Sequence, residues 1–391
     1  MEDIVIVDGC RTAIGTFGGS FADTSVTELG AIVIREAVKR AGVDPELVDQ
    51  VIMGNVGGAP EDAYIPRNAM LNAGLPITTP ALGVSRACGS GLEAIHNAAR
   101  WILTGDAEIV VAGGTENMSR IPYYLHRART GYRYGDGVLQ DGVQALLTDP
   151  NTNMIMGITA ENLAAKFELS RQVQDEYALR SQERAAKAIE AGYFEAQIVP
   201  VEVKKGRETV MFARDEHPRA TSMETLAKLR PAFKPDGDVT PGNSSGINDG
   251  AAAVVMMTAT KAKELGLRAR LRLVSRAVAG VEPTIMGSGP IPASQMALQK
   301  ANLTVDDMDV IELNEAFASV AAACSLGLNL PVDRTNPNGG AIALGHPVGA
   351  TGTILTLKLL HELERTGGRY GLVTLCIGGG QGIAAVFERI S

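Results

Sequence analysis

The 391-residue sequence is poor in aromatic residues, which make up 4% of it and include a single tryptophan. It also lacks a basic excess, because 36 Lys and Arg stand against 44 Asp and Glu, a formal net charge of −8. Nucleic-acid binding typically needs a basic stripe with stacking rings, and neither is present. We therefore expect no nucleic-acid partner.

Long apolar runs are absent as well, so no segment is predicted to cross a membrane. The first apolar pattern, residues 4–7, starts almost at the N-terminus, and no signal or transit peptide is expected before it. The last four residues, 388–391, are not a peroxisomal address. Together these features predict a cytoplasmic protein that does not associate with membranes.

Cysteine and histidine are also scarce, with four of the former and five of the latter. Cysteines at 10, 88, 324 and 376 form neither a CxxC pair nor a disulfide framework, which favours a reducing compartment. The histidines show no HxxxH or HExxH pattern, so we expect no metal site.

Glycine, in contrast, is abundant (44 residues), and hydrophobic residues reach 45%, which suits a densely packed α/β enzyme. An apolar segment, 80–84, leads to Cys88, which is followed by Gly-Ser-Gly and a helical pattern over 92–102. We expect Cys88 at a turn from an extended segment into a helix. Unpaired amides there would favour a thiolate. A buried cysteine that only fills space fits this pattern equally well.

Two stretches of the sequence, 41–55 and 301–315, resemble each other. Asp49 matches Asp309, and each stretch follows an amphipathic pattern and leads into a short strand pattern. A glycine-flanked reactive residue follows each copy: Cys88 in the first and His346 in the second. We interpret this as a duplicated βαβ-type unit, although glycines that open helices are common in α/β folds. A pseudo-twofold arrangement would bring the two residues together.

Residues 120–248 do not fit the repeat and are predicted to form an insertion within the first copy, with a long helix around 171–190. Such insertions often carry binding surfaces. The predicted domains are an N-terminal half, a loop domain and a C-terminal half. Their boundaries are 1–119 plus 249–268, then 120–248, and finally 269–391.

Two more stretches carry chemically capable residues. His346 lies between glycines, with Pro347 predicted in the first turn of a helix, and would act as the base for Cys88 if the two meet. A lone histidine can also be purely structural. Cys376 ends an apolar strand pattern before Gly378, and the glycine run after it can present amides to an oxyanion. No Lys-Ser/Thr follows, so this run is not a phosphate loop.

Four stretches together resemble the signatures of thiolases: CGSGLEA at 88–94, NEAFA at 314–318, GGAIALGHPVGATG at 339–352 and CIGGGQG at 376–382. RPAF at 230–233 and NSSGINDGAA at 243–252 are also similar to that family. The resemblance implies an α/β fold in which duplicated βαβαβαββ halves form a five-layered αβαβα core with an inserted loop domain.

The resemblance also implies roles for individual residues. Cys88 would be the acylated nucleophile, His346 its activator, and Cys376 the acid or base at the α-carbon of the second substrate. Asn314 would hold a water that, with His346, binds one thioester oxygen, and the amides of Cys88 and Gly378 would bind the other. Ser245 and Arg219 match positions that contact coenzyme A. Four further residues match the lining of the acyl pocket: Met156, Phe233, Met286 and Phe317.

The implied activity is reversible condensation of two acetyl-CoA to acetoacetyl-CoA and CoA, with these thioesters as substrates and no separate cofactor. A degradative 3-ketoacyl-CoA thiolase is the alternative, since Ser85 and Ile155 depart from residues common in the family. Ketoacyl synthases pair their cysteine with two histidines, which Cys376 argues against. A silent scaffold is a third possibility. Residues 127–142 resemble the family's tetramer-forming loop, so a homotetramer is expected.

Overall fold

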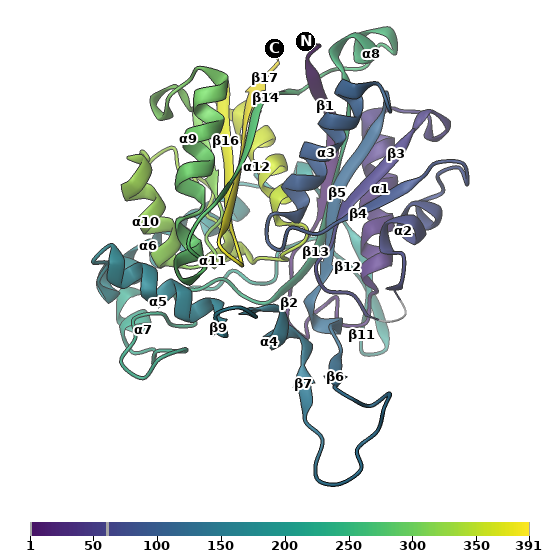
Figure 1. Ribbon diagram of the computed structural model, residues 1–391. Helices are drawn as coiled ribbons and strands as arrows, with labels where there is room; N and C mark the ends of the chain where they lie inside the picture. The colour runs from purple at the N-terminus through teal and green to yellow at the C-terminus, as the bar shows by residue number, and fades with distance from the viewer. Residues whose placement is uncertain (1, 60–61, 391) are drawn as a thin grey trace.

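The computed structural model describes residues 2–59 and 62–390 and shows an α/β protein built on one long mixed sheet (Figure 1). The path through this sheet is β15-β16-β17-β14-β1-β13-β5-β3-β4. The N-terminal half contributes β1 (Ile4–Thr12), β3 (Gln50–Gly54), β4 (Ala81–Val84), β5 (Val110–Asn117) and β13 (Asn248–Thr258). The C-terminal half contributes β14 (Leu271–Gly280), β15 (Val310–Leu313), β16 (Tyr370–Ile377) and β17 (Gln381–Arg389).

The two halves repeat one strand pattern. β3 runs parallel to β5, which is antiparallel to β13, which is antiparallel to β1. In the second half β15, β16, β17 and β14 follow the same order with the same directions. The halves join where β1 pairs with β14, at Val5–Arg272 and Ile6–Leu271.

Details of the hydrogen bonding support the predicted duplication. The carboxylate of Asp49 accepts from the amides of Glu108 and Ile109 at the start of β5. Its predicted counterpart, Asp309, accepts from the amides of Arg369 and Tyr370 at the start of β16. Both halves also shift register in the matching strand, between Ile6 and Asp8 in β1 and between Leu273 and Ser275 in β14.

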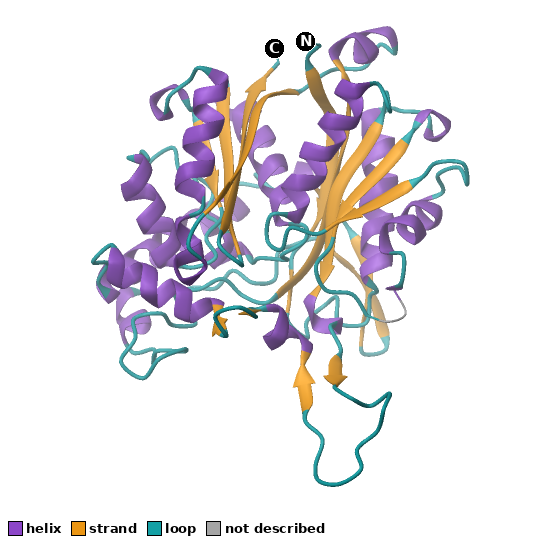
Figure 2. Ribbon diagram, in the orientation of Figure 1, coloured by secondary structure: helices purple, strands orange, loops and turns teal. Residues whose placement is uncertain are grey.

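Helices cover the two half-sheets and fill the space between them (Figure 2). α1 (Val26–Ala41) and α2 (Ile65–Ala73) pack on the N-terminal half, and α9 (Pro290–Ala301) and α10 (Ala318–Leu328) on the C-terminal half. α3 (Ser90–Thr104) and α12 (Thr351–Thr366) contact each other and form the middle layer. Thiolase-like layering α/β/α/β/α is therefore confirmed.

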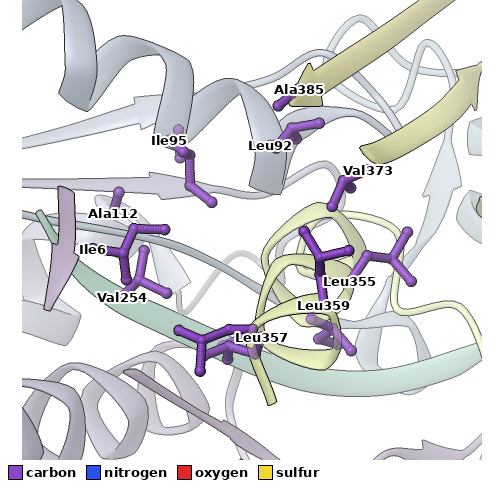
Figure 3. Close-up of a cluster of buried hydrophobic side chains, with 14 of the residues drawn as sticks. Ile6, Leu92, Ile95, Ala112, Val254, Leu355, Leu357, Leu359, Val373 and Ala385 are labelled. Carbon is purple, nitrogen blue, oxygen red and sulfur yellow. The ribbon is translucent and has the colours of Figure 1, made fainter. Parts of the chain in front are cut away.

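Apolar side chains from both halves meet around this middle layer in one buried cluster (Figure 3). Ile95 of α3 lies near Ile6, Ala112 and Val254 of the N-terminal strands, and Leu92 of the same helix lies beside Ala385 of the C-terminal half. Leu355, Leu357 and Leu359 of α12 extend the cluster to Val373 and Ala385 of the other half. Burial of this apolar surface holds the two copies together.

The segment between β5 and β13 leaves the sheet, as predicted for an insertion. It contains α4 (Gly142–Leu146), α5 (Met156–Lys166), α6 (Arg171–Glu190) and α7 (Met223–Ala227). It also contains the strand pairs β6 (Tyr123–Leu125) with β7 (Leu139–Asp141), β8 (Thr148–Asp149) with β9 (Met154–Ile155), and β11 (Val201–Lys205) with β12 (Glu208–Phe212), together with β10 (Ile198–Val199). The exact domain boundaries stay a prediction.

Buried polar contacts anchor this insertion. The guanidinium of Arg11 on β1 donates two hydrogen bonds to the carboxylate of Asp215, at 2.7 and 2.9 Å, and both side chains are buried. Asp215 also accepts from the amide of Ile14 at 2.8 Å. The paired charges and their additional hydrogen bond offset the cost of burial.

Most predicted elements are confirmed, but one is wrong. Pro347 was expected in the first turn of a helix, with His346 at its start. Instead a short helix, α11 (Ala341–Leu344), ends before His346, and α12 begins at Thr351. A single turn, in which the amides of Ala350 and Thr351 donate to the carbonyl of Pro347, separates the two helices.

Among the described residues, no helix is long and apolar enough to span a membrane.

Gly114 of β5 offers a test of how tightly the strand and the loop after His346 approach each other. A Cβ at Gly114 would collide with the carbonyl oxygen of Gly349. Gly114→Ala is expected to lower the free energy of unfolding by about 1–3 kcal/mol, because the backbone must shift to relieve the overlap. Chemical denaturation measures this change.

Gly280→Ala is the matched control, since a Cβ there meets no atom within 4 Å. We expect it to change stability little. Equal stability of the two variants would contradict the close approach.

Candidate active site

Cys88 lies in a short loop between β4 and α3, as the sequence predicts. The loop is tight: Ala87 has a φ of +40°, and the hydroxyl of Ser90 donates to the carbonyl of Ala87 at 2.7 Å. Gly89 is required here, because a Cβ would lie 2.6 Å from Cδ1 of Ile377 on β16. The loop that carries Cys88 therefore packs closely against β16 of the other half.

His346 lies in the loop between α11 and α12 and is 5% exposed. Its amide donates to Oδ1 of Asn248 at 2.9 Å, and Nδ2 of Asn248 donates to the carbonyl of Gly15. The preceding residue, Gly345, has a φ of +107°, and a Cβ there would lie 2.6 Å from Cγ of Asn248. The backbone of His346 is therefore clamped between glycine and asparagine.

The imidazole of His346 is oriented from both sides. Nδ1 lies 2.7 Å from Oγ1 of Thr351, and that hydroxyl donates its proton to the carbonyl of Pro347 at 2.8 Å. Thr351 therefore accepts, and Nδ1 carries the proton. Nε2 then has a lone pair, toward which the amide of Asn314 points at 3.3 Å. A neutral imidazole in this tautomer can take a proton at Nε2.

Cys376 and Asn314 come from neighbouring parallel strands, at the ends where α/β sheets place their sites. Cys376 is the penultimate residue of β16, and Asn314 directly follows β15. Gly378 follows β16, and its amide acts to lower the pKa of the Cys88 thiol, against the larger effect of burial, which raises it. The two thiols are near enough that charge on Cys88 raises the pKa of Cys376.

One cavity of about 450 Å³ lies beside the two thiols and the imidazole, whereas Asn314 and Gly378 are not among the residues that line it. Cys88, His346 and Cys376 all line it, from three separate segments of the chain. Most of the remaining lining is apolar, and its polar side chains come from the insertion: Asp141, Gln144, Ser244 and Ser245. The predicted residues Met156, Phe233, Met286, Phe317 and Ser245 also line this cavity, and Ile155 lies beside Met156 in the wall.

Burial sets the protonation states in this cavity. It raises the pKa of Cys88, although the amides of Gly378 and Cys88 act in the opposite direction. It raises the pKa of Cys376 well above its ordinary value and lowers the pKa of His346 to about 4. Desolvation therefore outweighs these amides, so the pKa of Cys88 is not lowered as its position before a helix suggests. Two thiols and a neutral imidazole are the resting state.

Arg219 does not line this cavity. It lies in a second cavity of about 770 Å³, bordered by α6 and residues 213–221. Its guanidinium donates to the carbonyl of Pro241, which does line the cavity of Cys88. The predicted contact of Arg219 with coenzyme A stays a prediction, as do the roles of the other residues.

Several polar residues that hold the site were not predicted. Asn248 and Thr351 fix His346, although both lie in stretches whose motifs were recognised. Glu116 on β5 is buried and accepts from the amides of Val56, Gly57 and Gly349 and from Nδ2 of Asn55. It joins the loop after β3 to the loop after His346. Nothing in its sequence context distinguishes Glu116 from a polar residue at the end of a strand.

Arg86, two residues before Cys88, connects the two loops that supply amides to the cavity. Its guanidinium donates to Glu93 on α3 at 2.9 Å and to the side chain of Gln381 at 2.9 Å. Gln381 begins β17, directly after the glycine run that contains Gly378.

Within the described part of the chain, no group of three or more His, Cys, Asp or Glu is arranged to hold a metal ion.

Comparison with known families agrees with this geometry. The model of the thiolase N-terminal domain matches residues 4–260, and that of the thiolase C-terminal domain matches residues 267–389. The chain belongs to the thiolase family.

Similar proteins match over their full length. The beta-ketothiolase BktB of Cupriavidus necator is 54% identical and the acetyl-CoA acetyltransferase of Escherichia coli 49% identical, each over 100% of both chains. The crystal structure of the Bacillus anthracis acetyl-CoA acetyltransferase superposes with a TM-score of 0.98 at 47% identity, covering 100% of this chain and 99% of that one. The crystal structure of human mitochondrial 3-ketoacyl-CoA thiolase in complex with CoA superposes with a TM-score of 0.96 at 44% identity, and the match covers 100% of this chain and 98% of that one.

Thr351→Val tests the orientation of His346. The substitution keeps the shape of the side chain but removes the acceptor for Nδ1–H, so the productive tautomer loses one hydrogen bond. A loss of about 1.4 kcal/mol corresponds to a tenfold lower kcat. Steady-state kinetics measures it, and Thr351→Ser should retain most activity. A Val variant as active as the Ser variant would contradict this role.

The pH dependence of acylation tests the state of His346. The base form exists above its pKa, so the rate should fall only as the pH drops through about 4, the pKa that burial gives His346. Rapid-quench measurement of CoA release in a single turnover gives this profile, with the fluorescence of Trp101 reporting that the protein stays folded. An acidic limb near 6.5, the ordinary value, would contradict a buried neutral imidazole.

Proposed function

We propose that the protein is an acyl-CoA C-acyltransferase that condenses two acetyl-CoA to acetoacetyl-CoA and CoA, reversibly, through an acyl-Cys88 intermediate. One observation carries the proposal: two cysteines and one histidine, from segments far apart in the sequence, line a single apolar cavity. Acyl transfer followed by carbon–carbon bond formation needs such a set, with one nucleophile and a separate base.

In the first step, Nε2 of His346 takes the proton of Cys88, and the sulfur attacks the thioester carbon of acetyl-CoA. The bond from that carbon to the CoA sulfur breaks, and the CoA thiolate takes the proton of Cys376. The products are acetyl-Cys88, CoA, an imidazolium at His346 and a thiolate at Cys376. The high pKa of Cys376 makes its thiolate a strong base.

In the second step, the Cys376 thiolate removes a proton from the α-carbon of a second acetyl-CoA. The resulting enolate attacks the acetyl carbon on Cys88, and the bond from that carbon to the Cys88 sulfur breaks. The imidazolium of His346 returns its proton to the departing thiolate. Acetoacetyl-CoA leaves, and all three residues regain their resting protonation.

Negative charge develops on a thioester oxygen in both steps and needs hydrogen-bond donors. The amides of Cys88 and Gly378, both of which act to lower the pKa of the Cys88 thiol, would bind one such oxygen. The buried Oδ1 of Asn314 has no hydrogen-bond partner among the described residues. It can therefore accept from a water that serves the other oxygen together with His346.

We propose that the residues of the cavity wall contact the substrate. Met156, Phe233, Met286 and Phe317 would contact the acyl group, and Ser245 the chain that joins it to the nucleotide of coenzyme A. Arg219, which lines the neighbouring cavity and donates to the carbonyl of Pro241, would contact another part of the coenzyme. Atoms and electrons balance without a redox or metal step, so we propose no resident cofactor. Because both cysteines must stay reduced, we place the enzyme in the cytoplasm.

A preference for longer 3-ketoacyl-CoA substrates is the second candidate. The cavity of about 450 Å³ is much larger than an acetyl group, and its wall includes Ile155 and Leu147, both apolar. Comparison of kcat/KM for acetoacetyl-CoA with kcat/KM for C8–C16 3-ketoacyl-CoA decides between the two. A higher value for the long substrates would replace the acetyl-specific assignment.

The substitution Cys88→Ala tests the central assignment. Without the nucleophile, condensation, thiolysis and acetyl exchange should all fall by more than about 10³-fold, as expected when covalent catalysis is lost. Cys10→Ala is the matched control, because Cys10 is buried in the core and does not line the cavity. Mass spectrometry after incubation with acetyl-CoA should show an acetyl group on the control and none on Cys88→Ala. Near-normal cleavage of acetoacetyl-CoA by Cys88→Ala would overturn the proposal.

We also propose a homotetramer that forms through the segment from β6 to β7. This hairpin projects from the body of the protein (Figure 1), and its apolar and aromatic side chains are exposed rather than packed. They include Tyr124, Leu125, Tyr134, Val138 and Leu139. Exposed apolar patches of this kind typically mark protein interfaces.

Double substitution Tyr134→Ser with Leu139→Ser should reduce the tetramer to a dimer, because it removes apolar area from the proposed interface. Light scattering after size-exclusion chromatography measures the mass. Met211→Ser, an exposed apolar side chain on β12, is the control and should remain tetrameric. A tetramer that survives the double substitution would contradict this assignment.

A further inference from the structure

A separate cavity of about 530 Å³ lies between α3 and β14, and the reaction proposed above does not use it. None of its lining residues lines the cavity of Cys88. It is bounded by one face of α3, the middle of β14 and the end of α9. The lining consists of His96, Arg100, Val274, Ser275, Arg276, Ala277, Val278 and Lys300.

The charges on this cavity are all positive. Arg100, Arg276 and Lys300 line it, and none of the carboxylates in residues 2–59 and 62–390 does. Glu93 is the nearest acid, and its carboxylate already binds both Arg86 and Arg100. Among the described residues, neither Arg276 nor Lys300 makes an ion pair, although Lys300 donates to the carbonyl of Arg276 at 3.1 Å. Such a cluster is unusual in a chain with a net charge of −8.

His96 provides an independent observation. Its side chain is buried, at 0% exposure for the residue, yet neither ring nitrogen has a hydrogen-bond partner among the residues that the structure describes. The closest acidic atom, Oε2 of Glu93, is 3.9 Å from Nδ1, which is too far for a hydrogen bond. Burial and then the surrounding cations keep the pKa of His96 well below its ordinary value, so the ring is neutral.

Buried polar groups without partners are rare in native proteins, and each needs an explanation. A neutral imidazole carries one N–H, and an oxyanion in the adjacent cavity would accept from it. The same anion would neutralise Arg276 and Lys300. One occupant therefore resolves both the unpaired donor and the uncompensated positive charge.

We propose that this cavity binds the phosphate group of a small molecule, with Arg276, Arg100 and Lys300 as its cationic contacts and His96 as a neutral donor. Guanidinium groups match the geometry of phosphate oxygens, and hydrogen bonds between ionised partners are roughly twice as strong as neutral ones. The volume of the cavity exceeds that of a single phosphate, which favours a diphosphate or a nucleotide over inorganic phosphate.

The site would communicate with the catalytic loop through Glu93. Arg100 and Arg86 share this carboxylate, and Arg86 also binds Gln381 beside the glycine run that contains Gly378. An anion that attracts Arg100 would change how firmly Glu93 holds Arg86. Through this connection, an anion bound at the phosphate site would affect the loops around Cys88 and Gly378. Binding of the anion can be tested without measuring activity.

Calorimetric titration of the full-length protein with pyrophosphate, inorganic phosphate and adenosine 3′,5′-bisphosphate tests the proposal. Arg276→Gln and Lys300→Gln should each weaken pyrophosphate binding by about tenfold or more, the effect of losing roughly 1.4 kcal/mol of charged contact. Lys263→Gln, an exposed lysine on α8 (Ala259–Glu264) outside the cavity, is the control for loss of one positive charge and should bind like the wild type. Lys300 is exposed, so its substitution should not impair folding.

A second readout follows His96 directly. Addition of pyrophosphate should shift the NMR signals of the His96 ring in the wild type, identified by their loss in His96→Leu. Tighter binding of the bisphosphate than of pyrophosphate would indicate a nucleotide, and the reverse order a diphosphate. No binding at millimolar concentrations, or equal binding by the wild type and both charge variants, would overturn the proposal.

Discussion

The absence of side chains between the starts of α3 and α12 is the constraint on which the catalytic arrangement depends. A Cβ at Gly91 would lie 3.0 Å from the carbonyl oxygens of Gly349 and Ala350, and one at Gly352 would collide with the backbone of Leu92. The hydroxyl of Thr353 on α12 donates to the carbonyl of Gly91 across this contact at 3.0 Å. Because the two helix starts touch, the loops that precede them bring Cys88 and His346 to one cavity.

Burial of the catalytic side chains is a second constraint, because it sets their protonation states. The amides at an isolated helix start would stabilise a thiolate. In a buried site the thiol keeps its proton until a base receives it, because burial disfavours the charged form. The structure supplies that base as a neutral imidazole, held by Thr351 on one side and facing Asn314 on the other. Charge then appears only when substrate is bound, in a cavity where amide donors are already in place.

Two cations that lie deep in the core of the protein are each compensated by a buried carboxylate. Arg11 is fully buried and is matched by Asp215, and Lys358 on α12 is matched by Glu312 on β15 at 2.6 Å. In contrast, Arg276 and Lys300 beside the buried His96 make no ion pair with any residue that the structure describes. The contrast between matched and unmatched cations is what gives the α3–β14 cavity its significance.

Much of this protein could be predicted from the sequence, because the relevant signals are local. The glycine-flanked cysteine, the repeated turn with Asp49 and Asp309, and the helix over 171–190 depend on residues close together in the chain, and each appears as expected. The boundary after His346 could not be predicted locally, since Pro347 fits a first helical turn but the chain instead makes a separate turn before Thr351.

Tertiary structure decided what depends on contacts between distant segments. The hydrogen bond from His346 to Asn248 spans 98 positions, and the one from Gly349 to Glu116 spans 233, so no local pattern reveals either. The protonation states of Cys88 and His346 also required the fold, because desolvation is a property of the closed cavity. The sequence therefore determined which residues could react, and packing determined where they meet and in which form, since burial and hydrogen bonding arise only once the chain has folded.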